Sequence, residues 1–260
     1  MGKDGVIKIL AIGNSFSQDA LAHLSEVAGA GGVTIMERNL FIGGCVLQRH
    51  WENVLSDAHD YSLQKCGKEV RANTSIREGL ELERWDYITL QQGSSQSCDF
   101  RFYNDEEHPY LTQLSEYVNK QVPGARQLIH ETWAYANNRA AAVLGYTGEA
   151  PQARNRMFAD VEACYLQAAK LLHTNVIPVG AAILAAQNRY GFSEDRMYLD
   201  GHHLSQPLGR VLASLVWYEA ITGRDARENP YTHPQITPDD LITLKQIAHE
   251  VVLDPKYGWA

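Results

Sequence analysis

The sequence predicts an α/β fold in which a mainly parallel, five-stranded sheet is covered by helices on both faces. Short apolar segments rich in β-branched residues alternate about five times with segments whose apolar residues have helical spacing. The first short segment, 6–12, is almost wholly apolar, which is typical of a strand buried on both faces of a parallel sheet. No Pro/Ser-rich linker and no internal repeat interrupts this alternation, so residues 1–260 are predicted to form one domain.

The strands are predicted from short apolar runs that end at polar or glycine-containing segments. Their ranges are 6–12, 33–42, 86–91, 126–130 and 175–179. Residues 60–73 alternate only weakly between apolar and polar side chains, which indicates a small hairpin.

Helices are predicted where apolar residues recur at helical spacing between and after these strands. Their ranges are 18–29, 47–58, 75–84, 107–120, 152–173, 204–222 and 238–252. Two of them have local start signals, because Ser75 and Glu78 match a capping box and Thr237 precedes a proline and two aspartates. The polar segments 93–106 and 133–151 are predicted to be long loops after the third and fourth strands.

Composition excludes several classes of function. The 260 residues include 23 Lys and Arg against 31 Asp and Glu, so the formal net charge is −8. This acidic balance argues against nucleic acid and anionic membrane surfaces as partners, because both attract basic patches. The longest apolar run, 176–186, is too short to span a bilayer. The N-terminus lacks a signal-peptide pattern, which predicts a cytoplasmic protein, or a secreted or periplasmic one if a leader was removed.

No cofactor and no metal is predicted, and the oligomeric state is left open. The four cysteines form no Cys-x-x-Cys pair and are expected to be free, buried thiols. The adjacent pairs His130-Glu131 and His202-His203 would face opposite ways on a strand, and no His-Glu-x-x-His motif is present. Phosphate-binding glycine motifs are also missing.

The segment that follows the first strand, Gly13-Asn14-Ser15-Phe16-Ser17, has the residue types of a nucleophile turn. Open parallel sheets bind ligands beyond the carboxyl ends of their strands, and a serine here is presented at that edge. The backbone N–H of Ser15 would lie at a helix N-terminus, which suits a nucleophile whose transition state carries a negative oxygen. Alone, the segment is more often a Ser or Asn helix cap without chemistry.

The segment Asp200-Gly201-His202-His203 has the residue types of an acid–base pair. Where the backbone turns, the Asp200 carboxylate can fix the tautomer of His203, which leaves the other ring nitrogen to take a proton from serine. His202 is a rival base, but an adjacent residue is expected to point elsewhere. Alone, this segment is more often an Asp helix cap with surface histidines.

Together, the two segments resemble the SGNH, or GDSL-type, hydrolase superfamily, in a branch with Gly-Asn-Ser-Phe at the nucleophile. The resemblance implies a flavodoxin-like, three-layer α/β/α sandwich and a serine esterase. It also implies that the partner is a small-molecule or glycan ester substrate. It makes Ser15 the nucleophile, Asp200 the orienting acid and His203 the base. An α/β-hydrolase is disfavoured, because the Gly-x-Ser-x-Gly pattern is broken at Ser17. Asn14 departs from the family's Asp and is expected to cap the turn.

The resemblance also implies an oxyanion hole. Ser15 contributes its own N–H, and Gly44, which follows the second strand, takes the place of the family's glycine; alone, it is equally typical of a plain turn. The family's third donor is an Asn in a Gly-x-Asn-Asp block, and alignment of that block puts Ser95 in its place. The third donor is then either Ser95 or the side-chain amide of Gln92 or Gln91, or else the oxyanion hole has only two donors.

The two long loops combine aromatic side chains with amides and charges, which suits sugar rings and is equally typical of loop anchoring. Trp133 and Tyr135 are the predicted substrate-binding residues. The predicted function is hydrolysis of small acyl esters, O-acetyl groups on a carbohydrate above all, through a Ser-His-Asp triad and an acyl-enzyme. The alternatives are a lipase, thioesterase or aryl esterase of the same fold, and a non-catalytic carbohydrate-binding protein that keeps the fold.

Overall fold

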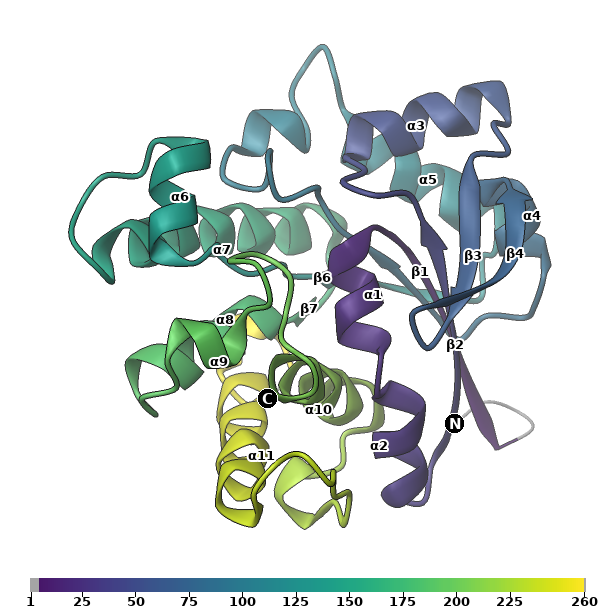
Figure 1. Ribbon diagram of the computed structural model, residues 1–260. Coiled ribbons are helices and arrows are strands. Elements are labelled where there is room, and N and C mark those ends of the chain that lie inside the picture. Colours follow the sequence, from purple (N-terminus) through teal and green to yellow (C-terminus); the bar gives the residue numbers. More distant parts are fainter. Residues whose placement is uncertain (1–4, 260) are drawn as a thin grey trace.

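The centre of the molecule is a sheet of seven strands (Figure 1). The computed structural model describes residues 5–259 of the chain. The strands are β1 (Val6–Gly13), β2 (Thr34–Phe41), β3 (Tyr61–Lys65), β4 (Lys68–Thr74), β5 (Tyr87–Leu90), β6 (Arg126–His130) and β7 (Val176–Ile177). Their spatial order is β4-β3-β2-β1-β5-β6-β7, and β1, β2, β5, β6 and β7 are parallel. The predicted α/β class with a mainly parallel sheet is confirmed.

The prediction of five strands is wrong, because a hairpin adds β3 and β4 to the sheet. β3 pairs antiparallel with the end of β2, and β4 pairs antiparallel with β3. β4 is exposed along most of its length, so it lacks the apolar alternation that identifies a strand with one buried face. The hairpin expected at 60–73 is therefore present, and it forms one edge of the main sheet.

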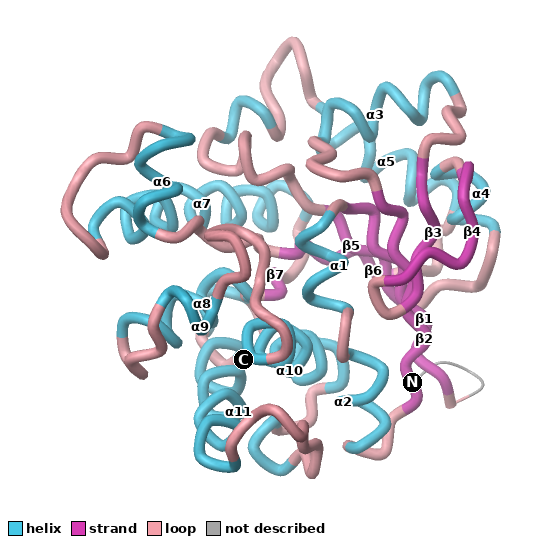
Figure 2. The backbone as a smooth tube through the Cα atoms, in the orientation of Figure 1, coloured by secondary structure: helices cyan, strands magenta, loops and turns pink. Residues whose placement is uncertain are grey.

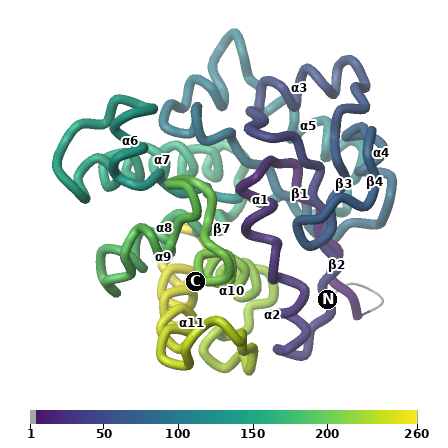
Figure 3. The backbone as a smooth tube through the Cα atoms, in the orientation of Figure 1, coloured from purple at the N-terminus to yellow at the C-terminus, as the bar shows by residue number. Residues whose placement is uncertain are grey.

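Helices cover both faces of the sheet (Figure 2). The longer helices are α1 (Ser15–Leu21), α2 (Leu24–Ala30), α3 (Leu47–Ser56), α5 (Tyr110–Gln121), α6 (Asn137–Leu144), α7 (Gln152–Leu172), α8 (Val179–Asn188), α10 (Leu208–Thr222) and α11 (Pro238–Val252). The short ones are α4 (Ile76–Glu81), α9 (Glu194–Met197), η1 (Phe100–Phe102), η2 (Ala226–Glu228) and η3 (Pro255–Tyr257). On one face α1, α2, α8 and α11 pack around α10, and on the other α3, α4 and α7 contact α5. The C-terminal helices thus return to the side that carries α1 and α2 (Figure 3).

Strand β1 determines where the functional residues meet. Residues 9–12 are fully buried, as predicted for a strand covered on both faces. β1 lies between β2 and β5, with Ile12 paired to Leu40 on one side and to Leu90 on the other. Because the three strands are parallel and in register, the segments that follow them meet at one edge of the sheet.

Most predicted helices are present with shifted ends. The segment 18–29 forms two helices, α1 and α2, and the helix expected at 204–222 begins one turn later. The capping box of Ser75 and Glu78 is confirmed at the start of α4. Thr237 also caps its helix as predicted.

Two regions differ more from the prediction. The strand expected at 175–179 is limited to β7, because Pro178 has no N–H for the sheet and precedes α8 directly. α8 is apolar on nearly every side and almost wholly buried, so it has no amphipathic pattern that would reveal it. The loop expected at 133–151 contains α6.

Buried apolar side chains from the sheet and both helix layers form one connected core. The four cysteines are free, as predicted. The prediction that they are buried is confirmed for Cys45 and Cys164 and is wrong for Cys66 and Cys98, which are partly exposed. Between residues 5 and 259, no helix combines the length and the apolar character that crossing a membrane would require.

Candidate active site

Ser15 lies where β1 turns into α1. Asn14 is the N-cap of α1, and its Oδ1 accepts a hydrogen bond from the N–H of Phe16 at 2.9 Å. Ser15 is the first helical residue, so its own N–H is one of those that a helix leaves without an internal partner. The Ser15 side chain is half-buried, and its Oγ makes no hydrogen bond to any residue from 5 to 259. Its hydroxyl is therefore free to meet a ligand.

A cavity of about 410 Å³ opens beside Ser15. It is lined by residues at or after the carboxyl ends of β1, β2 and β5, together with the loop before α10: Asn14, Ser15, Phe16, Gln18, Phe41, Gly43, Gly44, Ser94, His202 and His203. Three predicted site residues from distant parts of the sequence, Ser15, Gly44 and His203, thus share one cavity.

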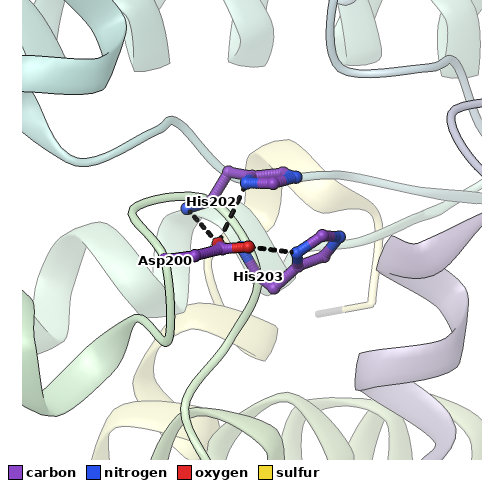
Figure 4. A group of neighbouring side chains, drawn as sticks. All are labelled: Asp200, His202 and His203. Carbon is purple, nitrogen blue, oxygen red and sulfur yellow. Dashed lines mark hydrogen bonds and ion pairs between the residues drawn. The ribbon is translucent and has the colours of Figure 1, made fainter.

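The loop that carries Asp200 and His203 folds around the aspartate (Figure 4). Asp200 Oδ2 lies 2.7 Å from His203 Nδ1, and Oδ1 accepts from the N–H groups of His203 at 2.9 Å and His202 at 3.1 Å. Partial burial raises the pKa of Asp200, but these hydrogen bonds outweigh it and hold the pKa well below its ordinary value. The ionised carboxylate makes His203 Nδ1 the donor, which leaves Nε2 to accept a proton.

His202 was expected to point elsewhere, but this expectation is wrong, because His202 lines the same cavity as His203. Its Nδ1 lies 2.9 Å from Asp200 Oδ1, but without the alignment of a hydrogen bond. Its ring packs edge-on against Tyr135, with 5.6 Å between centroids, and beside the ring of His203. Burial, and then the charge of His203, lower the pKa of His202 to about 4. At neutral pH this imidazole is therefore uncharged.

The two aromatic residues predicted to bind substrate are buried instead. Trp133 is 0% exposed; its Nε1 donates to the carbonyl oxygen of His202 at 2.6 Å, and its ring lies 4.2 Å from that of Phe16. Tyr135 is 4% exposed, and its hydroxyl lies 2.7 Å from Ser94 Oγ. Rings without an open face cannot stack on a sugar, so these two residues support the cavity walls from behind.

The loop after β2 is tied to the nucleophile turn through Asn14. Gly44 has φ +63°, a left-handed conformation that favours glycine. Asn14 Nδ2 donates to the carbonyl oxygen of Cys45 at 3.0 Å, and Gln91 Nε2 donates to Asn14 Oδ1 at 2.7 Å. An aspartate in place of Asn14 would have no N–H to donate to Cys45, so this contact requires the amide.

The structure places the predicted third oxyanion donors away from the cavity. Gln91 belongs to the buried network at Asn14, and Gln92 is fully buried with its Nε2 donating to a backbone carbonyl at 2.7 Å. Ser95 is exposed and does not line the cavity. Ser94, one residue earlier, does line it, and the residue pattern contained no signal that separated the two serines.

The family model described as "Domain of unknown function (DUF4886)" matches residues 8–251. The chain belongs to the DUF4886 family. A crystal structure of a DUF4886 family protein from Bacteroides uniformis ATCC 8492 is 35% identical, with 96% of each chain covered and a TM-score of 0.86. No curated protein matches the sequence.

More distant structures share the fold of this DUF4886 chain. A proposed SGNH hydrolase from Slackia heliotrinireducens is 24% identical over 82% of this chain and 98% of its own, with a TM-score of 0.56. A variant of an acetyl xylan esterase from Geobacillus stearothermophilus is 14% identical over 88% of this chain and 97% of its own, with a TM-score of 0.52. The resemblance to SGNH hydrolases is thus confirmed for the fold.

Two groups of side chains in the described part of the DUF4886 chain have the spacing of a metal site, with ligand atoms within 4.8 Å of one another. They are Asp200, His202 and His203 at the cavity, and Glu219, Asp225 and His249 at the C-terminal helices. In the first group Asp200 already bonds the Nδ1 of His203. This is the arrangement that proton transfer from a serine requires.

Proposed function

We propose that this DUF4886 protein is a serine esterase that removes small acyl groups, O-acetyl groups above all, from a carbohydrate. The observation that carries the proposal is that Ser15 and His203 line one cavity while Asp200 Oδ2 lies 2.7 Å from His203 Nδ1. The SGNH hydrolase fold supports it. The fold shared with an acetyl xylan esterase supports the choice of acyl group.

The capping alternatives do not account for the three side chains. Asn14, not Ser15, caps α1, so capping leaves the free Ser15 hydroxyl unexplained. Asp200 is not the N-cap of the following helix, because α10 begins only at Leu208. Its carboxylate binds an imidazole as well as two backbone N–H groups. Acyl transfer gives each of these groups a role.

In the proposed reaction, Ser15 Oγ attacks the acetyl carbonyl carbon while His203 Nε2 takes the hydroxyl proton. The N–H groups of Ser15 and Gly44 and the hydroxyl of Ser94 donate to the oxyanion of the tetrahedral intermediate. Breakage of the ester C–O bond releases the sugar hydroxyl, which receives the proton from His203. Water, deprotonated by His203, then attacks the acetyl-enzyme, and acetate leaves as the proton returns to Ser15.

The cavity favours a small acyl group. Its volume of about 410 Å³ lies near the lower end of the range for small-molecule sites, about 300–1,000 Å³. Phe16 and Phe41 contribute apolar walls, whereas Gln18 and Ser94 contribute groups that can hydrogen-bond sugar hydroxyls. The expected preference is therefore for acetate over longer acyl chains.

Hydrolysis of p-nitrophenyl acetate and butyrate near neutral pH tests the proposal. We expect the wild type to prefer acetate and Ser15→Ala to lower kcat/KM by about 10⁴-fold or more, because the nucleophile is lost. Ser56→Ala, an exposed serine at the end of α3, is the matched control and should keep full activity. A fluorophosphonate probe should label Ser15 in the wild type, as read by mass spectrometry of the digested protein.

The outcomes separate the alternatives. A preference for butyrate or longer chains would replace the acetylesterase by a lipase, thioesterase or aryl esterase. A wild type that neither hydrolyses esters nor reacts with the probe would overturn the esterase proposal in favour of carbohydrate binding without turnover.

A further inference from the structure

A buried carboxylate connects the helix that begins with Ser15 to the loop that carries His203. Asp19 lies one turn after Ser15 on α1 and is 1% exposed. Its Oδ2 accepts a hydrogen bond from the N–H of Leu204 at 2.8 Å, and its Oδ1 lies 2.7 Å from an Nη of Arg210. Leu204 follows His203 directly, and Arg210 belongs to the first turn of α10. One side chain thus contacts both ends of the segment between His203 and α10.

Asp19 is also the link that orients the loop toward α1. The ring of His202 also lies near that of Phe16 on α1, with 6.5 Å between centroids. Other hydrogen bonds of the loop run elsewhere: Trp133 Nε1 donates to the carbonyl of His202, and the N–H of Ala136 donates to the carbonyl of Gly201 at 2.7 Å. Within residues 5–259, the hydrogen bonds between loop residues 198–207 and α1 come from Asp19 alone. Figures 1 and 3 show this green loop beside the purple α1, although Asp19 and Leu204 are 185 residues apart in sequence.

We propose that Asp19 is a positioning residue that sets the distance and orientation of the His203 ring relative to Ser15. The inference rests on the proposed function of these two residues. A carboxylate suits this role, because its two oxygens accept from a backbone N–H and a guanidinium at the same time. Arg210 compensates the charge of Asp19, which would otherwise be costly to bury. Small displacements between nucleophile and base have large effects on rate, so a fixed link between them is useful.

The test compares Asp19→Ala and Asp19→Asn with a matched control, Glu219→Ala. Glu219 is also buried on a helix: its Oε2 accepts from the N–H of Ala226 at 2.7 Å and its Oε1 lies 2.7 Å from His249 Nδ1. Like Asp19, Glu219 thus contacts one backbone N–H and one basic side chain, but it lies away from the cavity. Three quantities are measured for each variant: kcat and KM for p-nitrophenyl acetate, the rate of fluorophosphonate labelling, and hydrogen–deuterium exchange of the peptide that contains Leu204.

We expect Asp19→Ala to lower kcat and the labelling rate by about 10- to 100-fold at a nearly unchanged KM. The Leu204 amide should exchange faster in this variant. Asp19→Asn should recover part of kcat, because its amide oxygen can still accept from Leu204. Glu219→Ala should lower the temperature of unfolding with little change in kcat. If Asp19→Ala does not fold, Asp19→Asn carries the test, with kcat expected to fall by up to about 10-fold at a nearly unchanged KM.

Two results would overturn the inference while the wild type is active. One is a kcat for the Asp19 variants equal to that of the wild type, and the other is a loss in kcat no greater than that of Glu219→Ala. An inert wild type would instead overturn the proposed function. In that case, unchanged exchange of the Leu204 amide in the Asp19 variants would show that Asp19 does not anchor the loop either.

Discussion

At the scale of single residues, Asn14 uses both the oxygen and the N–H group of its side-chain amide. Its Oδ1 accepts from Phe16 and Gln91, while its Nδ2 donates to Cys45, next to Gly44. An aspartate could keep both accepted bonds but would place a second oxygen against the carbonyl of Cys45. It would also bring a charge to a position that is 1% exposed.

Asn14→Asp should therefore lower both the stability of the protein and the proposed esterase activity. We expect a loss of about 1–3 kcal/mol in the free energy of unfolding, because a buried acceptor faces another acceptor. We expect kcat to fall by about 10- to 100-fold, because the Gly44 loop is no longer held against the nucleophile turn. Urea unfolding and steady-state kinetics measure the two effects.

Asn53→Asp is the control for this substitution, because Asn53 is buried on α3 and does not line the cavity. It should lower stability and leave kcat nearly unchanged. An Asn14→Asp enzyme with wild-type kcat would show that the Cys45 contact is not needed for activity.

The residues of the candidate site differ in how far sequence could predict them. Ser15 and His203 were predicted because short motifs in a fixed order place them at one edge of a parallel sheet. Ser95 was predicted at the cavity where the structure has Ser94, because the choice between two adjacent serines depends on the path of a loop. Trp133 was assigned to substrate, because composition cannot show which face of an aromatic ring is covered.

At the scale of elements, the predictable features are those with local causes. The capping box at α4 was predicted because its two partners are three residues apart. α8 was missed, since a helix buried on nearly every side depends on its neighbours and has no amphipathic pattern. The β3–β4 hairpin was predicted as a local unit, but its place in the sheet depends on contacts with β2.

The capping box gives a prediction about α4. Ser75 Oγ accepts from the N–H of Glu78 at 3.2 Å, and the N–H of Ser75 donates to Glu78 Oε2 at 3.0 Å. Ser75→Ala should lower the free energy of unfolding by about 1 kcal/mol, because the Glu78 N–H loses its partner. Since α4 does not contribute to the cavity, kcat should be unchanged. A drop in kcat without a change in the urea midpoint would contradict this assignment.

At the scale of the whole molecule, buried titratable groups couple stability to pH. His50 and His130 are fully buried, and burial lowers the pKa of each to about 3. In the unfolded chain each histidine titrates near about 6.5. Between these values the unfolded state binds a proton that the native state does not, so stability falls as the pH falls. Burial also raises the pKa of Glu131 well above its ordinary value. Above about pH 4.3 the native state therefore keeps a proton that the unfolded state has lost, and this offsets the effect of one histidine on stability.

His130→Asn isolates one of these contributions. His130 Nδ1 lies 3.0 Å from Gln91 Oε1, and an Asn side-chain amide can replace this donor. The free energy of unfolding of the wild type should rise with pH between about 4 and 6, and the variant's slope should be smaller by about 1.4 kcal/mol per pH unit. Loss of packing against Trp217 lowers the variant's stability at every pH and leaves its slope unaffected. Surface groups contribute equally to both proteins. Equal slopes of the free energy of unfolding against pH would therefore mean that His130 binds the same number of protons in the native and the unfolded state.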